Sequence, residues 1–215
     1  MLLRGWESAD ILARDQVRRR NEPILNAMAT ACKQGQRAGG TQPLLLRLRR
    51  RPGTRSEGLL LLKGQAIRCA IGRSAIHAPK REGDGATPVG RLRLLAVLYR
   101  ADRGPPPATR LPVRAIRRDE GWCDAPFDPN YNRSIRLPYR PSHEVMGRED
   151  ALYDIVVILD WNLTRRLRGR GSAIFLHIAR PDFGPTAGCL ALTPRDMRRL
   201  LRSLPRHAVI YIEGQ

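Results

Sequence analysis

Lysines, aromatic side chains and long apolar runs are scarce in this sequence. Only three of its 39 cationic residues are lysine, and aromatic residues make up 5% of the chain. So few aromatic side chains provide no evident stacking platform for single strands, and no nucleic-acid partner is expected. No apolar run approaches the length needed to cross a bilayer. We therefore expect no transmembrane segment.

The N-terminus has no uninterrupted apolar stretch of the kind that a secretory signal contains. Acidic and basic residues break every short apolar run in residues 1–28, so no signal peptide is visible. Either the mature protein stays inside the cell or the start of the chain is atypical.

Cysteine is sparse, and no CxxC pair occurs. The four cysteines are Cys32, Cys69, Cys123 and Cys189. This spacing predicts no structural zinc site, and we expect no metal. A disulfide between any two of them stays open. A catalytic thiol must remain free, which leaves at most one bridge among the other three.

Positive charge is the feature in excess. The formal net charge is +19 at pH 7, and almost all of it comes from arginines spread along the chain. Clustered cations attract anionic polymers. A true polyanion-binding surface and a plain compositional preference for arginine are both compatible with this pattern.

The chain is predicted to hold one domain behind an N-terminal extension. Residues 33–43 read KQGQRAGGTQP, a Gly- and Gln-rich stretch typical of a linker. We therefore assign residues 1–41 to an extension and linker and residues 42–215 to a single domain, a length that can bury a full core. From Leu44 the runs LLLRLRR and GLLLLKGQAIRCAIGRS, separated by RPGTRSEG, predict an opening β-meander.

Buried strands and one helix are predicted further along the chain. The apolar, β-branched runs at 153–162 and 171–179 favour central strands. RLRLLAVLYR and AIRRDEGW are shorter strand candidates within a long loop-rich section, 78–150. TPRDMRRLLRSLP predicts a helix that Thr193 caps, with Asp196 reaching back to the cap, and HAVIYIEG predicts a final strand.

A histidine and a cysteine near each other in the chain are the candidate catalytic residues. His177 lies in the apolar strand SAIFLHI, and Gly188-Cys189 follows the turn-rich segment RPDFGPTAG. A loop of this length can bring the thiol beside the imidazole, which then accepts its proton so that the thiolate attacks a carbonyl. Gly188 permits a sharp turn. Taken singly, a histidine or a cysteine in such a strand is more often a packing residue.

Three stretches, in order, resemble the L,D-transpeptidase catalytic domain (YkuD-like) family of bacterial peptidoglycan enzymes. The first is His177 followed by Thr186-Ala187-Gly188-Cys189-Leu190-Ala191-Leu192. The second is the loop Lys80–Gly90, similar to the family's GDGATPxG, and the third is Gly121-Trp122-Cys123-Asp124 with Asp128–Arg133, which is similar to one divergent branch. Better-known branches have Ser-His before Gly-Cys and an arginine two residues after the cysteine, where this chain has Thr186, Ala187 and Ala191.

The resemblance implies a mainly β (α+β) fold, a curved sheet sandwich with few helices. It also implies a two-step acyl transfer between peptidoglycan stem peptides, in the periplasm or cell envelope, by a monomer without a cofactor. Cys189 would be the nucleophile, His177 the base, and the amides of Gly188 and Cys189 the oxyanion donors. The predicted substrate-binding residues are Arg180, Thr186, Tyr131, Arg133 and His143.

Several alternatives stay open at this stage. The missing arginine leaves Arg133, Arg148 and Arg180 as candidates to hold a substrate carboxylate. The loop Lys80–Gly90 either lines the substrate or is a surface hairpin, and His143 either contacts the substrate or lies in a solvated loop. With water as the acceptor, the same residues would make a carboxypeptidase or endopeptidase. A non-enzymatic polyanion-binding module is the other alternative.

Overall fold

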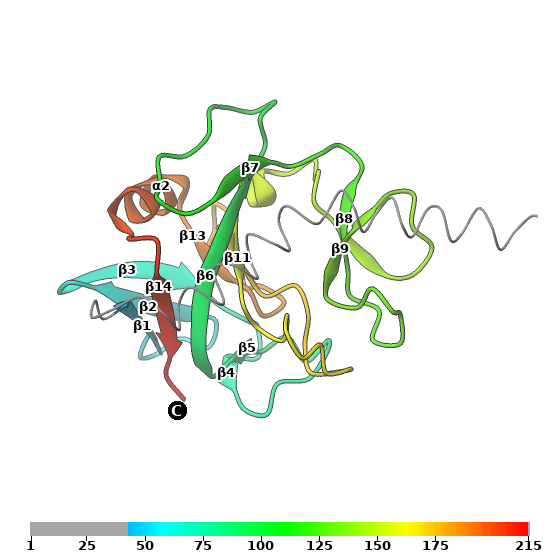
Figure 1. Ribbon diagram of the computed structural model, residues 1–215. Coiled ribbons are helices and arrows are strands. Elements are labelled where there is room, and N and C mark those ends of the chain that lie inside the picture. Colours follow the sequence, from blue (N-terminus) through cyan, green and yellow to red (C-terminus); the bar gives the residue numbers. More distant parts are fainter. Residues whose placement is uncertain (1–42, 215) are drawn as a thin grey trace, which may run out of the picture.

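A computed structural model of the protein describes residues 43–214 (Figure 1). The predicted extension, residues 1–41, and Cys32 lie outside this range, so the domain boundary stays a prediction. The strands are β1 (Leu44–Arg50), β2 (Glu57–Leu62), β3 (Gln65–Ala70), β4 (Ile76–His77), β5 (Thr87–Pro88), β6 (Gly90–Tyr99), β7 (Val113–Ala115), β8 (Glu120–Cys123), β9 (Arg133–Arg136), β10 (His143–Val145), β11 (Ile155–Leu159), β12 (Phe175–Ile178), β13 (Leu190–Leu192) and β14 (Ala208–Ile212). The helices are a 3-10 turn, η1 (Ala151–Tyr153), and α2 (Pro194–Ser203).

The main sheet closes on itself. Its strand order is β11-β12-β13-β3-β2-β1-β14-β6-β7, and β11 also pairs with β6. β8, β9 and β10 form a separate three-stranded sheet, which Figure 1 shows to the right of the main sheet. The predicted mainly β fold with few helices is confirmed.

Alternation of side chains along the strands divides the core in two. On β12, Leu176 and Ile178 belong to a large cluster that also receives α2, whereas Phe175 joins a second cluster with Trp122 and Tyr153. The second cluster joins the small sheet to the outer face of β11 and β12. Both predicted central strands, β11 and β12, are buried throughout, as expected for strands covered on two sides.

Two strand predictions need correction. The run GLLLLKGQAIRCAIGRS is not one strand but two, because Lys63 and Gly64 both adopt positive φ (47° and 79°) and turn the chain into a hairpin. AIRRDEGW is likewise divided: β7 ends at Ala115, and β8 begins at Glu120 in the small sheet. The opening meander and the strand RLRLLAVLYR are confirmed.

The predicted helix forms as the sequence indicates. The Thr193 hydroxyl accepts a hydrogen bond from the Asp196 amide at 3.0 Å and donates one to the Asp196 carboxylate at 2.7 Å. Pro194 occupies the first helical position, where a missing amide hydrogen costs nothing. Within residues 43–214, no helix is long and apolar enough to span a bilayer.

Candidate active site

The predicted nucleophile and base lie on one face of the sheet. β12 and β13 run parallel, with Leu176 opposite Leu190 and His177 opposite Ala191. Because Leu176 and Ile178 point into the large cluster, His177 points to the other face. Cys189 directly precedes Leu190 and packs against the second cluster, on this same face.

The Cys189 thiol is held by the backbone at the start of β12. Its Sγ donates to the Ala173 carbonyl at 3.1 Å and accepts the Phe175 amide at 3.3 Å. Within the part of the chain that the structure describes, no hydrogen bond joins this sulfur to His177. Burial raises the pKa of the Cys189 thiol to about 12. The resting thiol is therefore protonated at neutral pH and needs a base before it can attack.

His177 is set up to accept a proton. The residue is 6% exposed, and Nδ1 lies 2.8 Å from the Ile178 carbonyl. A carbonyl can only accept, so Nδ1 carries the hydrogen and Nε2 keeps its lone pair. Burial lowers the pKa of His177 to about 4, although the Ile178 carbonyl works in the opposite direction. The imidazole is consequently neutral at pH 7.

Tyr153 packs on the His177 ring and is itself contacted by Glu144 and Arg148. Tyr153 meets the imidazole edge-on, with ring centroids 5.5 Å apart. The Tyr153 hydroxyl lies 3.3 Å from the Glu144 carboxylate, and the Arg148 guanidinium lies 5.1 Å from the centre of the Tyr153 ring. Arg148 was one of three candidate carboxylate anchors, but sequence reasoning missed Tyr153 and Glu144 as site residues. The packing of η1 on β12 brings Tyr153 here, and Glu144 follows through its contact with the Tyr153 hydroxyl.

Thr186 builds the turn that carries the cysteine. Its hydroxyl accepts the Gly188 amide at 3.1 Å and donates to the Cys189 carbonyl at 2.7 Å. The hydroxyl therefore uses both its donor and its acceptor capacity inside the turn. Its predicted contact with substrate stays a prediction.

Gly188 occupies a position that tolerates no side chain. Its φ is +138°, and a Cβ there would stand 2.7 Å from the Ala86 carbonyl oxygen. The first property disfavours L-residues, and the second would force two backbone segments apart. The turn thus depends on glycine for two separate reasons.

We expect Gly188→Ala to cost more stability than Gly90→Ala, by about 1–3 kcal/mol. Gly90 is a matched control, since its φ is +140° but no atom lies within 4 Å of a Cβ built on it. Because the two φ angles are nearly the same, the difference between the variants reports the clash with Ala86. Urea denaturation of both variants measures it. Equal losses would show that the loop and the turn are not in tight contact.

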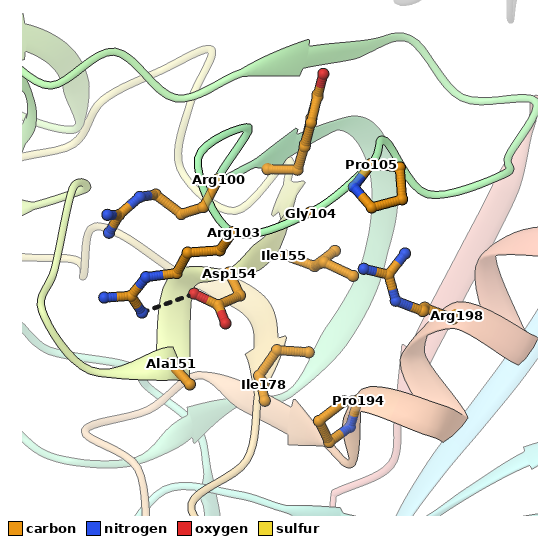
Figure 2. Close-up of a pocket in the computed structure, with 11 residues that line it drawn as sticks. Arg100, Arg103, Gly104, Pro105, Ala151, Asp154, Ile155, Ile178, Pro194 and Arg198 are labelled. Carbon is orange, nitrogen blue, oxygen red and sulfur yellow. Dashed lines mark hydrogen bonds and ion pairs between the residues drawn. The ribbon is translucent and has the colours of Figure 1, made fainter.

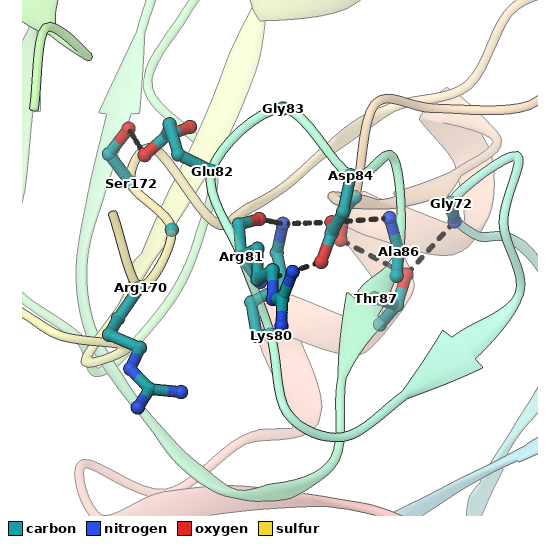
Figure 3. Close-up of polar contacts among 12 residues, drawn as sticks. Gly72, Lys80, Arg81, Glu82, Gly83, Asp84, Ala86, Thr87, Arg170 and Ser172 are labelled. Carbon is teal, nitrogen blue, oxygen red and sulfur yellow. Dashed lines mark hydrogen bonds and ion pairs between the residues drawn. The ribbon is translucent and has the colours of Figure 1, made fainter.

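The loop Lys80–Gly90 fastens both segments that hold the thiol (Figure 3). The Thr87 hydroxyl accepts the Gly72 amide at 2.9 Å and donates to the Gly188 carbonyl at 3.0 Å. On the other side, the Ser172 hydroxyl donates to the Glu82 carboxylate at 2.8 Å, next to Ala173. The loop is therefore packed against the Gly-Cys turn rather than being a free surface hairpin.

A buried ion pair shapes this loop. Lys80 is 5% exposed, and its Nζ lies 2.5 Å from the Asp84 carboxylate, which also accepts the Ala86 amide at 2.8 Å. The ion pair lowers the pKa of Asp84 against the opposing effect of burial. It holds the loop in the conformation that places the Ala86 carbonyl against Gly188.

The remaining predicted binding residues lie in two places. Arg180 is exposed just beyond β12. Tyr131, Arg133 and His143 instead belong to the small sheet and its connections. Tyr131 is 2% exposed and donates to Glu82 at 2.5 Å, while His143 Nδ1 lies 2.7 Å from the Pro141 carbonyl. Arg133 is exposed at the start of β9. Substrate contacts for these residues stay predictions.

A groove of about 590 Å³ begins at Ile178, the residue after His177, and its lining is mostly apolar. It is lined by Asp150, Ala151, Leu152, Ile178, Ala179, Arg180, Pro181, Phe183, Thr193 and Pro194. Two of its charged residues, Asp150 and Arg180, act on the pKa of His177, raising and lowering it respectively. The groove and the candidate base therefore share one electrostatic environment.

A smaller cavity of about 90 Å³ lies next to this groove, between η1, α2 and the chain after β6 (Figure 2). An ion pair of 2.9 Å between Arg103 and Asp154 stands at its edge. Ile178 and Pro194 line both spaces. Arg100, Arg103 and Asp154 are already in ion pairs, and we assign no chemistry to this cavity.

Metal ligands do not gather in the described part of the chain: residues 43–214 contain no group of three or more His, Cys, Asp or Glu side chains placed to bind an ion. Cys69, Cys123 and Cys189 are all free thiols.

The sequence model of one family, YkuD, the L,D-transpeptidase catalytic domain, matches residues 55–212. No curated protein matches the chain.

Proposed function

Because the chain belongs to the L,D-transpeptidase catalytic domain family, we propose that it cross-links peptidoglycan stem peptides through a thioester on Cys189. The observation that supports this most is the position of Cys189 and His177 on one sheet face, with His177 neutral and its Nε2 unprotonated. A neutral imidazole near a protonated thiol is the starting state that general-base activation requires. The proposed place of action is the cell envelope.

The first half of the proposed reaction forms the acyl-enzyme. Nε2 of His177 takes the thiol proton, and the sulfur attacks the carbonyl carbon of an L-centre in the donor stem. The tetrahedral intermediate collapses when the amide bond to the next D-residue breaks, and His177 gives its proton to the departing amine. The donor stem is left as a thioester on Cys189.

The second half passes the acyl group on. An amine of a neighbouring stem attacks the thioester carbonyl and loses its proton to His177. The C–S bond breaks, and the thiolate regains that proton. No group outside the chain and its two substrates is needed to balance this exchange.

The oxyanion donor needs one revision from the sequence prediction, which named the amides of Gly188 and Cys189. The Gly188 amide donates to Thr186 within the turn. We therefore assign the oxyanion to the Cys189 amide, which the φ of Gly188 orients. Thr186 then acts as a positioning residue, because its hydroxyl holds the Gly188 amide and the Cys189 carbonyl.

Arg180 is the best-placed anchor for a substrate carboxylate. Arg148 already pairs with Asp150 at 2.7 Å, whereas Arg180 makes no ion pair with any residue between 43 and 214. Arg180 also lines the groove beside His177. We propose that the donor stem lies in this groove with a carboxylate on Arg180.

We expect Arg180→Gln to raise the KM for a stem-peptide donor by about tenfold or more, because a charge-assisted hydrogen bond is lost. The kcat should change little, since the guanidinium does not touch the reacting atoms. Arg133→Gln is the comparison, as Arg133 lies in the small sheet. A raised KM for the Arg133 variant alone would instead assign the binding of the substrate carboxylate to Arg133 on β9.

The test of the function is mass spectrometry of products made by the purified full chain from disaccharide–peptide fragments of peptidoglycan. Transfer yields cross-linked dimers, and the mass of each dimer identifies the bond. Shortened monomers without dimers would mean that water is the acceptor and that the protein is a carboxypeptidase or endopeptidase. No turnover of any fragment, together with no thioester adduct from a carbapenem, would contradict the proposal.

A further inference from the structure

Two neighbouring loops expose large apolar side chains. Phe127 is 84% exposed and Leu167 is 51% exposed, the two highest values among the large hydrophobic residues of the described chain. The loops touch, because the Arg166 guanidinium donates to the Pro129 carbonyl at 3.1 Å. At their base, the Asn132 side chain donates to the Trp161 carbonyl at 3.1 Å.

These apolar side chains are held outward by fixed loops. The Asn162 amide group accepts the Leu167 N–H at 2.8 Å and donates to the Leu167 carbonyl at 2.9 Å, so both backbone groups of Leu167 are tied to one side chain. The Asp128 carboxylate accepts the Asn130 amide at 2.7 Å and the Tyr139 hydroxyl at 2.7 Å, which fixes the turn next to Phe127. The hydrogen bonds of the two loops therefore keep Phe127 and Leu167 exposed.

Arginines without acidic partners flank Leu167, whereas the Phe127 loop contains Asp124 and Asp128. The segment 161–170 contains four arginines and no aspartate or glutamate. Arg165, Arg168 and Arg170 are exposed and make no ion pair with any residue from 43 to 214. We name Phe127, Arg165, Leu167, Arg168 and Arg170 together the tip surface.

We propose that the tip surface docks on an anionic phospholipid bilayer, with Phe127 and Leu167 entering the headgroup region and the arginines binding lipid phosphates. Leu167, flanked by cations that make no ion pair and joined by a second exposed apolar side chain on the touching loop, matches an interface that is negative outside and apolar beneath. Leu167 offers no stacking face, and a single phenylalanine makes no platform for successive bases, so a nucleic acid fits less well.

The surface is connected to the candidate active site through Asn132. The Asn132 side-chain oxygen accepts the Ala173 amide at 3.1 Å, and the Ala173 carbonyl accepts the Cys189 thiol. Docking by the tip surface would therefore hold the thiol at a fixed depth relative to the bilayer. The proposal itself does not depend on acyl transfer.

Co-sedimentation with vesicles tests the proposal. The full-length protein is mixed with vesicles of equal parts phosphatidylglycerol and phosphatidylcholine, or of phosphatidylcholine alone, at about 0.1 M salt, where the Debye length is about 10 Å. We expect binding to the anionic vesicles only. Cys189→Ala should bind equally well, which separates this test from that of the enzymatic function.

The decisive comparison is between two triple variants that remove the same charge. Arg165, Arg168 and Arg170 changed to Gln should weaken binding roughly a hundredfold, because each arginine near an anionic bilayer contributes about a factor of five. Arg195, Arg199 and Arg202 changed to Gln on the exposed face of α2 should leave binding nearly unchanged, since Figure 1 shows α2 far from β8 and β9. Phe127→Ser should weaken binding about tenfold.

Four results would overturn the proposal. They are no binding of the wild-type chain to anionic vesicles, equal losses for the two triple variants, unchanged binding of Phe127→Ser, and tighter binding of a single-stranded oligonucleotide that depends on Phe127. The last would assign the surface to nucleic acid. The arginine and phenylalanine side chains that are substituted are all exposed, and thermal unfolding followed by circular dichroism checks that each variant, Cys189→Ala included, is folded.

Discussion

Cys189→Ala is expected to lower the rate of dimer formation by roughly 10⁴-fold or more, because the acyl group then has no covalent carrier. The folded structure should persist, since the side chain is small and alanine keeps the backbone of the turn. Chromatography of the fragments with mass detection measures the rate. The same variant should also show no mass increase after incubation with a carbapenem, whereas the wild-type chain gains one adduct.

The control for this prediction is Cys123→Ala. Cys123 is another buried free thiol, and burial raises its pKa to about 11. It lies in the small sheet, opposite His143. Full activity and a full adduct in Cys123→Ala, with neither in Cys189→Ala, would assign the chemistry to one sulfur. Dimers from the Cys189 variant would exclude the thioester mechanism.

His177→Gln is expected to lower the same rate by about 10²–10⁴-fold, the usual contribution of a positioned general base. Glutamine retains a hydrogen-bonding side chain of similar size but takes no proton. Since the pKa of Cys189 is raised to about 12, a thiol without its base ionises only as hydroxide increases. Alkylation of the variant thiol by iodoacetamide should therefore rise about tenfold per pH unit between pH 7 and 10.

The wild-type enzyme should show a different pH dependence. His177 must be neutral to accept the proton, and burial lowers its pKa to about 4. Activity should consequently persist well below pH 6.5, where an ordinary histidine would be half protonated, and fall as the pH approaches 4. An acid limb centred near 6.5 would mean that the imidazole is solvated during turnover. Indistinguishable pH profiles for wild type and His177→Gln would remove His177 from the mechanism.

Local patterns in the sequence predicted those features that neighbouring residues determine. The Thr193 cap depends on residues three positions apart, and the buried runs at β11 and β12 are visible from composition alone. His177 lies on β12 and Cys189 directly precedes the adjacent parallel strand β13, with one loop between them, so their spacing in the chain already limits their spacing in the fold. The hairpin at Lys63-Gly64 was missed because leucines flank it on one side and no Asn-Gly or Asp-Gly pair marks it.

Features that depend on distant residues had no local signal. The contact of Tyr153 with His177 arises because η1 packs on β12, and the Glu144 carboxylate arrives from a different sheet. Thr87 and Gly188 are 101 residues apart, yet a hydrogen bond joins them. The GDGATPVG loop could be recognised by resemblance, but its role in fastening the Gly-Cys turn could not be deduced from its residues.

The strands from β11 round to β6 form a closed ring, so none of them is an edge strand that could change register alone. Because β11 is paired on both sides, shifting β12 along β13 by one residue would also require the register of β11 with β12, or of another pair in the ring, to shift. Such a slip would exchange the inward and outward side chains of β12 and bury the imidazole of His177 among leucines. The closed sheet therefore fixes the direction in which the base faces, independently of any contact that the base itself makes.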